Sequence, residues 1–134
     1  MLKKTILYFA GTKFKIEYIF DGQHKSYEAI LAQVFEEDYV FQIIAISEYE
    51  AGYIKGYIKK EFKNVHAVSY DYLYTELERI FSTILKFEII NKDKHTATYK
   101  EVEKMVKEFP SEYDTLVKYG TVPSAVYHKE QNKK

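Results

Sequence analysis

The segment from residue 39 to residue 46 constrains the fold most, because it is apolar throughout except for Gln42. A strand with apolar residues on both faces is typical of a parallel sheet that helices cover on both sides. Apolar stripes with helical spacing precede it, from Tyr27 to Phe35, and follow it, from Ile54 to Phe62. Alternating strands and helices predict an α/β fold, a Rossmann-like and mostly parallel sheet flanked by helices.

The N-terminal part of the chain predicts a β-hairpin that follows the first strand. Residues 4–9 read as a strand that ends at Ala10-Gly11-Thr12. Residues 14–20 begin with the period-two alternation of a half-buried strand, and Asp21-Gly22 is a strong two-residue turn signal. We therefore expect a hairpin insertion between the first strand and the predicted helix at residues 27–35.

The second half of the chain predicts two short strands and three helices. Residues 65–68 and 87–90 are the strands, and the apolar stripe from Leu73 to Ile84 marks the clearest helix. Thr98 with Glu101 forms a capping box for the next helix, and a last helix from Glu112 ends at Gly120. We expect one domain over residues 1–123 and a polar tail over residues 124–134.

Composition excludes several classes of function. The chain has 134 residues, no cysteine and a formal net charge of zero, which excludes a disulfide framework and a zinc–thiolate site. No apolar stretch reaches the about 18 residues of a membrane helix, and Ile6 to Ala10 is too short for a signal-peptide core. We expect a cytoplasmic protein without a membrane partner. Neutral charge argues against long nucleic acid but allows a small anion, bound by lysines or backbone amides because Arg79 is the sole arginine.

Catalytic and metal-binding motifs are absent. The sequence has no G-x-S-x-G, P-loop or H-E-x-x-H pattern, and its histidines show no metal-ligand spacing. We therefore expect neither a bound metal nor a cofactor.

Four segments follow the ends of predicted strands, where ligands bind in an open parallel sheet. These segments are residues 10–13, 47–50, 69–72 and 91–98. In the first, Gly11 allows a close backbone approach, while Thr12 and Lys13 supply donors for a phosphate or ribose. An ordinary turn explains the same residues.

The last of these segments is the richest in chemistry. It contains Asn91, Lys92, Lys94, His95 and Thr96. His95 exchanges protons near neutral pH if its pKa is unperturbed, and a lysine neutralises a phosphate. The alternative is a solvated charged loop.

The two middle segments have simpler explanations. Ser47 with Glu50 is a capping-box pattern that could also present amides to an anion. Residues 69–72, which begin with Ser69, open a predicted helix, and Tyr70 or Tyr72 could stack on a base. Capping and ordinary packing are the alternatives.

The N-terminal residues resemble the CRISPR-associated Rossmann-fold (CARF) domain family. Residues 5–12 resemble the first strand and glycine–threonine loop of that family, and residues 18–22 the hairpin of one branch. Residues 29–31 resemble its next helix, residues 44–48 its hydrophobic strand with a terminal polar residue and acid, and residues 76–81 a later helix.

This resemblance implies a homodimer that binds a cyclic oligoadenylate second messenger. A free-standing member would sequester the ring or cleave it without a metal, by attack of a ribose 2′-hydroxyl that leaves a 2′,3′-cyclic phosphate. The protein would orient the ring and stabilise charge. The expected catalytic residues are Thr12, Lys94 and His95. The expected ligand contacts are Ala10, Gly11, Lys13, Ser47, Ser69, Tyr70, Asn91, Lys92 and Thr96.

Two other hypotheses stay open. A small immunity or anti-defence protein would act by protein–protein binding, and Tyr49, Tyr53 and Tyr57 on one predicted helix would supply the surface. A messenger-binding transcription regulator is opposed by the neutral charge and by the lack of a clear helix-turn-helix.

Overall fold

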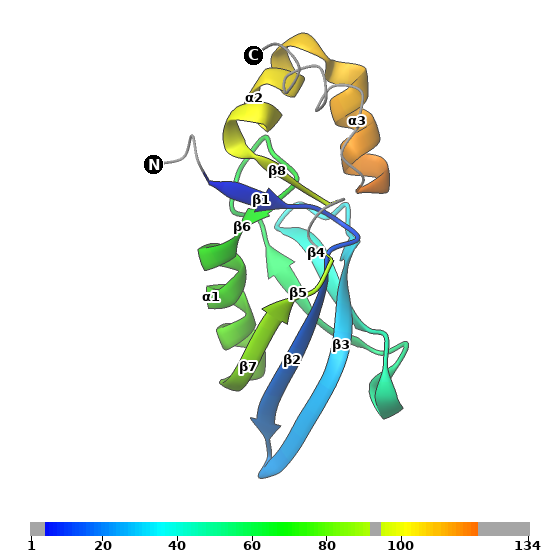
Figure 1. Cartoon of the computed structure of the whole chain (residues 1–134), viewed down its shortest axis with the longest axis vertical. Helices are drawn as coiled ribbons and strands as arrows, with labels where there is room; N and C mark the ends of the chain where they lie inside the picture. The colour runs from blue at the N-terminus through cyan, green and yellow to red at the C-terminus, as the bar shows by residue number, and fades with distance from the viewer. Residues whose placement is uncertain (1–4, 92–94, 121–134) are drawn as a thin grey trace.

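The computed structural model describes residues 5–91 and 95–120, and its largest element is a five-stranded sheet (Figure 1). The strand order is β5-β4-β3-β2-β7, and every neighbouring pair is antiparallel. The strands are β2 (Lys13–Phe20), β3 (Gln23–Gln33), β4 (Tyr39–Ala45), β5 (Ile54–Lys59) and β7 (Thr83–Ile89).

A smaller sheet of three antiparallel strands has the order β6-β1-β8. Its strands are β1 (Ile6–Tyr8), β6 (Val68–Ser69) and β8 (Thr96–Thr98), and the helices are η2 (Glu48–Glu50), α1 (Tyr70–Phe81), α2 (Tyr99–Glu108) and α3 (Pro110–Tyr119). Figure 1 shows α1 beside the five-stranded sheet and α2 and α3 beyond the three-stranded sheet. None of the helices in the described residues is long and apolar enough to cross a membrane.

The prediction of a Rossmann-like, mostly parallel sheet is wrong, because both sheets of the described residues are antiparallel. The apolar run that suggested it is β4, an inner strand of the larger sheet. Val40, Phe41 and Ile43 are buried, whereas Ile44 on the opposite face is only half-buried. Apolar residues on both faces of β4 therefore do not imply helices on both sides.

The predicted helices over residues 27–35 and 54–62 are also wrong. Asp21 and Gly22 both have positive φ, the turn geometry that favours a tight hairpin, and β3 pairs with β2 from Gln23 to Ile30. Continuous pairing across this hairpin outweighs the helical spacing of the apolar residues in β3. The stretch beginning at Ile54 pairs with β4 as strand β5.

Other predictions are confirmed. The hairpin at Asp21-Gly22 is present, and α1 carries the stripe that begins at Leu73. Thr98 and Glu101 form the reciprocal capping box at the start of α2. Gly120 ends α3 with a φ of +72°.

The described residues form two hydrophobic cores. The larger core lies between α1 and one face of the five-stranded sheet, where Leu73, Leu77 and Phe81 meet the inward side chains of the strands. The smaller core joins the three-stranded sheet to α2 and α3 through Leu7, Phe9 and other residues. Since the helices pack in these two places, the second face of the five-stranded sheet has no helical layer among the described elements.

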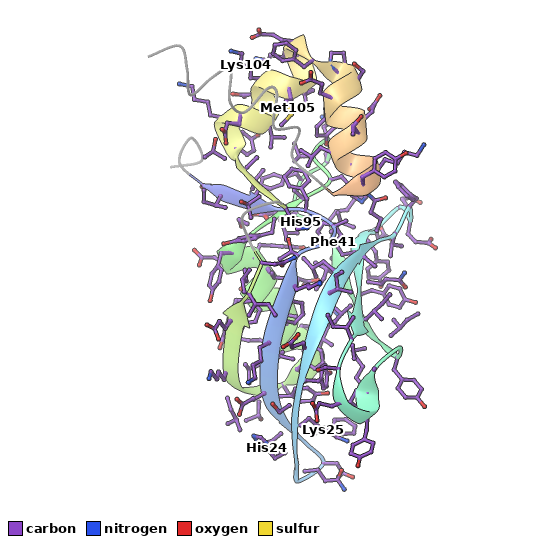
Figure 2. The ribbon with its side chains drawn as sticks, turned by 45° about the vertical axis from the view of Figure 1, so that its right-hand side comes forward. His24, Lys25, Phe41, His95, Lys104 and Met105 are labelled. Carbon is purple, nitrogen blue, oxygen red and sulfur yellow. The ribbon has the colours of Figure 1, made fainter. Side chains whose placement is uncertain are left out.

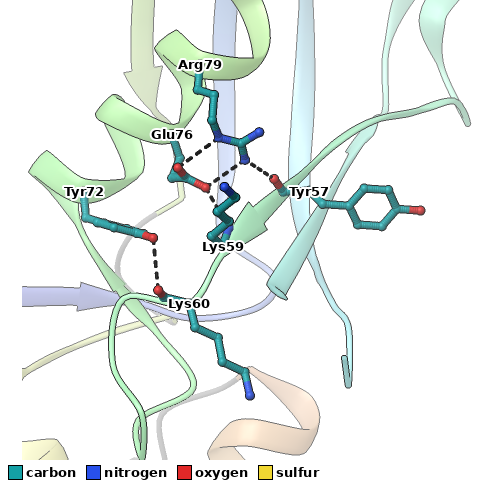
Figure 3. A network of polar contacts seen from close by, with 6 residues as sticks. All are labelled: Tyr57, Lys59, Lys60, Tyr72, Glu76 and Arg79. Atoms are coloured by element: carbon teal, nitrogen blue, oxygen red, sulfur yellow. Dashed lines mark hydrogen bonds and ion pairs between the residues drawn. The ribbon is translucent and has the colours of Figure 1, made fainter. Parts of the chain in front are cut away.

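The exposed edge of β5 is closed by two side chains of α1 (Figure 3). Glu76 Oε1 accepts a hydrogen bond from Lys59 N at 2.7 Å, and Arg79 Nη2 donates to Tyr57 O at 2.8 Å. Arg79 also donates to both carboxylate oxygens of Glu76. The pair supplies the acceptor and donor that one residue of a neighbouring strand would supply, which protects this stretch of the edge from strand addition.

We expect Glu76→Gln to lower the free energy of unfolding by about 1–3 kcal/mol, because the substitution weakens charge-assisted hydrogen bonds of a buried carboxylate. Urea unfolding monitored by circular dichroism measures the change. Glu78→Gln, on the exposed side of the same helix, is the matched control and should stay within about 0.5 kcal/mol of the parent. Equal midpoints for the two variants would contradict the role of Glu76.

Candidate functional site

Two of the four predicted ligand segments meet at the junction between the sheets. Asn91 Nδ2 donates to Gly11 O at 3.0 Å, and Asn91 Oδ1 accepts a hydrogen bond from Lys13 N. On the other side of the loop, Phe9 N donates to His95 O at 2.9 Å. We call Gly11, Lys13, Asn91 and His95 the junction cluster. Lys92 and Lys94 lie outside the described residues.

The ring of His95 lies directly against Gly11, near the middle of Figure 2. A Cβ atom on Gly11 would lie 2.5 Å from His95 Cε1, and Gly11 has a φ of +93°. His95 Nδ1 lies 2.6 Å from Gly120 O. Because a carbonyl oxygen only accepts, Nδ1 carries the proton, and a neutral ring then has Nε2 as its acceptor nitrogen. The contact with Gly120 O therefore sets the orientation of the His95 ring.

Thr12 holds the loop itself rather than facing a ligand, and Ala10 is buried in the larger core. Thr12 is fully buried, and its Oγ1 donates to Phe9 O at 2.7 Å. Gly11 N and Thr12 O bond to the backbone of Leu31 in β3. These contacts give Thr12 a structural role that the sequence does not reveal, since a hydroxyl in a loop looks available in the sequence alone. Thr96 lies in β8, paired with Tyr8.

The remaining predicted site residues bind to other parts of the structure. Ser47 Oγ accepts from Glu28 N at 2.7 Å and makes no side-chain cap of η2. Ser69 precedes α1 and donates through both N and Oγ to the carboxylate of Glu61. Tyr70 is 42% exposed, with its ring centroid 5.6 Å from that of Phe87. These contacts engage Ser47 and Ser69 in local structure, while Tyr70 keeps an exposed ring.

A second candidate region lies along β5 and the turn before it. Five large apolar side chains are exposed there. We call this set the β5 margin: Ile46, Tyr49, Tyr53, Ile54 and Tyr57. The prediction that its tyrosines share one helix is wrong, because Tyr49 belongs to η2 and Tyr57 to β5. Their exposure nevertheless gives the tyrosine-rich surface that the interaction hypothesis requires.

The β5 margin continues onto the face of the five-stranded sheet opposite α1. Ile54 pairs with Ile44, and Ile44 pairs with Ile30, so these three side chains form a row across three strands. Next to the row, the ring centroids of Tyr57 and Tyr39 are 5.6 Å apart. We call this the outer face. The sequence has no period-two signal for this face, because Ile54 and Tyr57 are three residues apart and reach the same face through the register shift opposite Ile43 and Ile44.

Glu50 anchors the turn that presents the β5 margin. Its carboxylate contacts Lys55 Nζ and Lys25 Nζ, and these lysines hold its pKa below the usual value, with the Lys55 hydrogen bond contributing most. Lys55 Nζ also lies 5.5 Å from the ring centroid of Tyr27, whose pKa is raised by burial and by its hydrogen bond with Tyr18. The turn is therefore attached to both β3 and β5.

Comparisons with known proteins leave the function to be argued from this geometry. A scan against protein-family models gives no match, and searches of curated proteins and of solved structures give none either. Among residues 5–91 and 95–120, no group of three or more histidines and acids is placed to hold a metal ion.

We expect Gly11→Ala to displace the His95 ring and to lower the free energy of unfolding by about 2–4 kcal/mol, from a positive φ and a steric overlap together. Gly52→Ala is the matched control, because Gly52 has the same φ of +93° and a Cβ atom added there would have nothing within 4 Å. Gly52→Ala should lower the free energy of unfolding by only about 1–2 kcal/mol, the cost of backbone strain. Urea unfolding and the His95 ring signals in NMR measure both effects; equal losses with unmoved His95 signals would contradict the packing.

Proposed function

We propose that this protein acts by binding another protein through the β5 margin and the adjoining outer face. The observation that carries the proposal is the concentration of exposed apolar side chains in one segment. Of the thirteen strongly exposed large apolar residues in the described part of the chain, five fall between residues 46 and 57. A contiguous exposed apolar surface is typical of an interaction site.

The side chains of this surface suit a protein partner. Tyrosine supplies a large ring and a hydroxyl with little rotamer entropy, and it is enriched among the residues that dominate binding energy. Tyr49 is 97% exposed and Tyr53 is 65% exposed, so both are available to a partner without rearrangement. The adjacent acid Glu48 does not favour a polyanion such as nucleic acid, whereas the charge of Glu50 is already paired with Lys25 and Lys55.

The closed edge of β5 indicates how a partner would bind. Addition of a strand along β5 requires its free backbone groups, and Glu76 and Arg79 already occupy those of Tyr57 and Lys59. Side-chain contacts on the outer face are unaffected by this closure. A small immunity or anti-defence protein, which needs a surface and no catalytic centre, fits this arrangement.

We expect the double substitution Ile54→Glu with Tyr57→Lys to weaken partner binding by about 30-fold or more, because it places charge at the centre of the proposed contact. The partner is first identified by photo-crosslinking from Tyr53 in cells that make the protein, with Lys100 on α2 as the comparison position. Affinity is then measured by calorimetry on purified components.

Leu85→Glu is the matched control, since Leu85 is 54% exposed on the opposite edge strand β7. It should change the affinity by less than about threefold. Equal cross-linking from positions 53 and 100, or equal losses in the two variants, would contradict the proposed surface.

A second candidate function, binding of a cyclic oligoadenylate, is favoured by the junction cluster alone. That hypothesis assumed that the four predicted ligand segments lie together at one edge of a parallel sheet, which the antiparallel strands contradict. Gly11, Lys13, Asn91 and His95 nevertheless lie together. The Lys13 side chain and the oriented imidazole of His95 suit a phosphate with its ribose, while the amide of Asn91 holds the backbone of Gly11 and Lys13 in place. Homodimer formation and cleavage of the ring stay predictions of the family resemblance.

We expect the ligand, at a concentration well above its dissociation constant, to raise the melting temperature by several degrees, because it binds only the folded chain. Lys13→Gln should abolish most of the shift, and Lys100→Gln should keep it. A melting temperature that cyclic and linear oligoadenylates leave unchanged would reject this second function. Light scattering on the same samples gives the oligomeric state.

A further inference from the structure

A cavity of about 490 Å³ opens where α3 meets the turn after β3 and the segment from Lys60 to His66. Figures 1 and 2 show the end of α3 beside the β3–β4 turn, away from η2 and the start of β5. The volume lies within the range of about 300–1,000 Å³ that small-ligand sites occupy. None of the residues of the β5 margin lines it.

Aromatic rings form one wall of this cavity. Phe35 stacks on His66, with ring centroids 5.5 Å apart and an interplanar angle of 24°, and Phe41 packs edge-on against the same imidazole at 5.7 Å. Phe35 is 74% exposed and lines the cavity. Val65 and Val117 add aliphatic surface. The lining therefore offers a flat apolar group both aromatic and aliphatic contacts.

The lining of the cavity contains more lysines than acids, and Lys118 Nζ lies 5.6 Å from the ring centroid of Tyr119. Lys60, Lys63 and Lys118 line the cavity, against the single acid Asp114. The backbone of Lys60 is fixed, because its N donates to Asp38 O at 3.0 Å and its O accepts from Tyr72 Oη at 3.0 Å, the contact drawn in Figure 3. The backbone of Lys60, from which its side chain extends, is therefore held at the edge of the cavity.

One polar atom in this wall lacks a partner. His66 Nε2 is buried and makes no hydrogen bond with any residue in the described ranges. Burial and the nearby Lys60 lower the pKa of His66, and the ring's hydrogen bond with the backbone of Val40 offsets this only in part, so the ring is neutral at pH 7. The His66 backbone is held by its amide, which donates to Tyr113 Oη at 3.0 Å. A buried ring nitrogen without a hydrogen-bond partner lowers the stability of the fold unless a ligand or water bonds to it.

We propose that this cavity binds a small organic anion that joins a flat ring to one sulfonate, carboxylate or phosphate group. The ring packs against Phe35 and the valines, the anionic group lies among the lysines, and His66 Nε2 bonds to a polar atom of the ligand. Lysines act as point charges without the bidentate geometry of arginine. The site therefore selects a flat, negatively charged ligand but distinguishes little among sulfonate, carboxylate and phosphate groups. This site is independent of the protein-binding surface.

The probe for this proposal is 8-anilinonaphthalene-1-sulfonate, a fluorescent aromatic anion, titrated into the folded full-length protein. We expect saturable binding of one probe per chain. The double variant Lys60→Gln with Lys118→Gln should weaken binding by about tenfold or more, because two charge contacts are lost. The control double variant Lys86→Gln with Lys100→Gln, at exposed lysines on β7 and α2, should bind as the parent does.

NMR locates the bound probe. The ring signals of His66 should shift on saturation, while those of His24 and His95 stay in place, with assignments made from His→Gln variants. Displacement by adenosine monophosphate would identify a nucleotide-like ligand, and displacement by 1-naphthoate but not by the nucleotide an aromatic acid; either result supports the site. Binding that does not saturate, equal affinities of the two double variants, or an unmoved His66 signal would overturn the proposal.

Discussion

The hydrogen bonds of Glu76 and Arg79 to the edge of β5 determine which parts of the five-stranded sheet are open to a partner. They fix α1 against one face and occupy the backbone groups of Tyr57 and Lys59 that would otherwise accept a further strand. Burial by itself raises the pKa of Glu76, but the hydrogen bonds from Arg79 and from the Lys59 amide outweigh this and hold its pKa below the usual value. The carboxylate is therefore charged at neutral pH, as this bonding requires.

This arrangement leaves exposed side chains, rather than exposed backbone, as the means of recognition. With α1 on the inner face and α2 and α3 on the smaller sheet, the row from Ile30 to Ile54 lies on the face without a helical layer among the described elements. Glu50, between Lys25 and Lys55, holds the turn that places the tyrosines beside this row. The junction cluster and the cavity at His66 are separate places with different chemistry.

Local signals in the sequence predicted those elements whose causes are local. The turn at Asp21-Gly22, the capping box from Thr98 to Glu101 and the terminal Gly120 each depend on a few adjacent residues. The strands β3 and β5 depend on pairing with β2 and β4, and their apolar residues fit a helical stripe equally well. Only tertiary pairing distinguishes a strand from a helix in these two segments. The parallel fold was inferred from helices predicted there, and it was therefore wrong.

The candidate site shows the same division. The meeting of residues 10–13 with Asn91 and His95 was expected for a parallel sheet, yet it arises from hydrogen bonds at a junction of antiparallel sheets. Ser47 and Ser69 lie elsewhere because each serves its own local structure. The partnerless Nε2 of His66 had no sequence signal, since Phe35, Lys60 and α3 come together around it only in the folded chain.

Hydrogen–deuterium exchange of the protein, alone and bound to its partner, tests the central claim most directly. Our account predicts slower exchange on binding for residues 42–57, which cover the second half of β4, η2 and the start of β5, and unchanged exchange for α2 and α3. Protection confined to α2 and α3, with residues 42–57 unaffected, would contradict it.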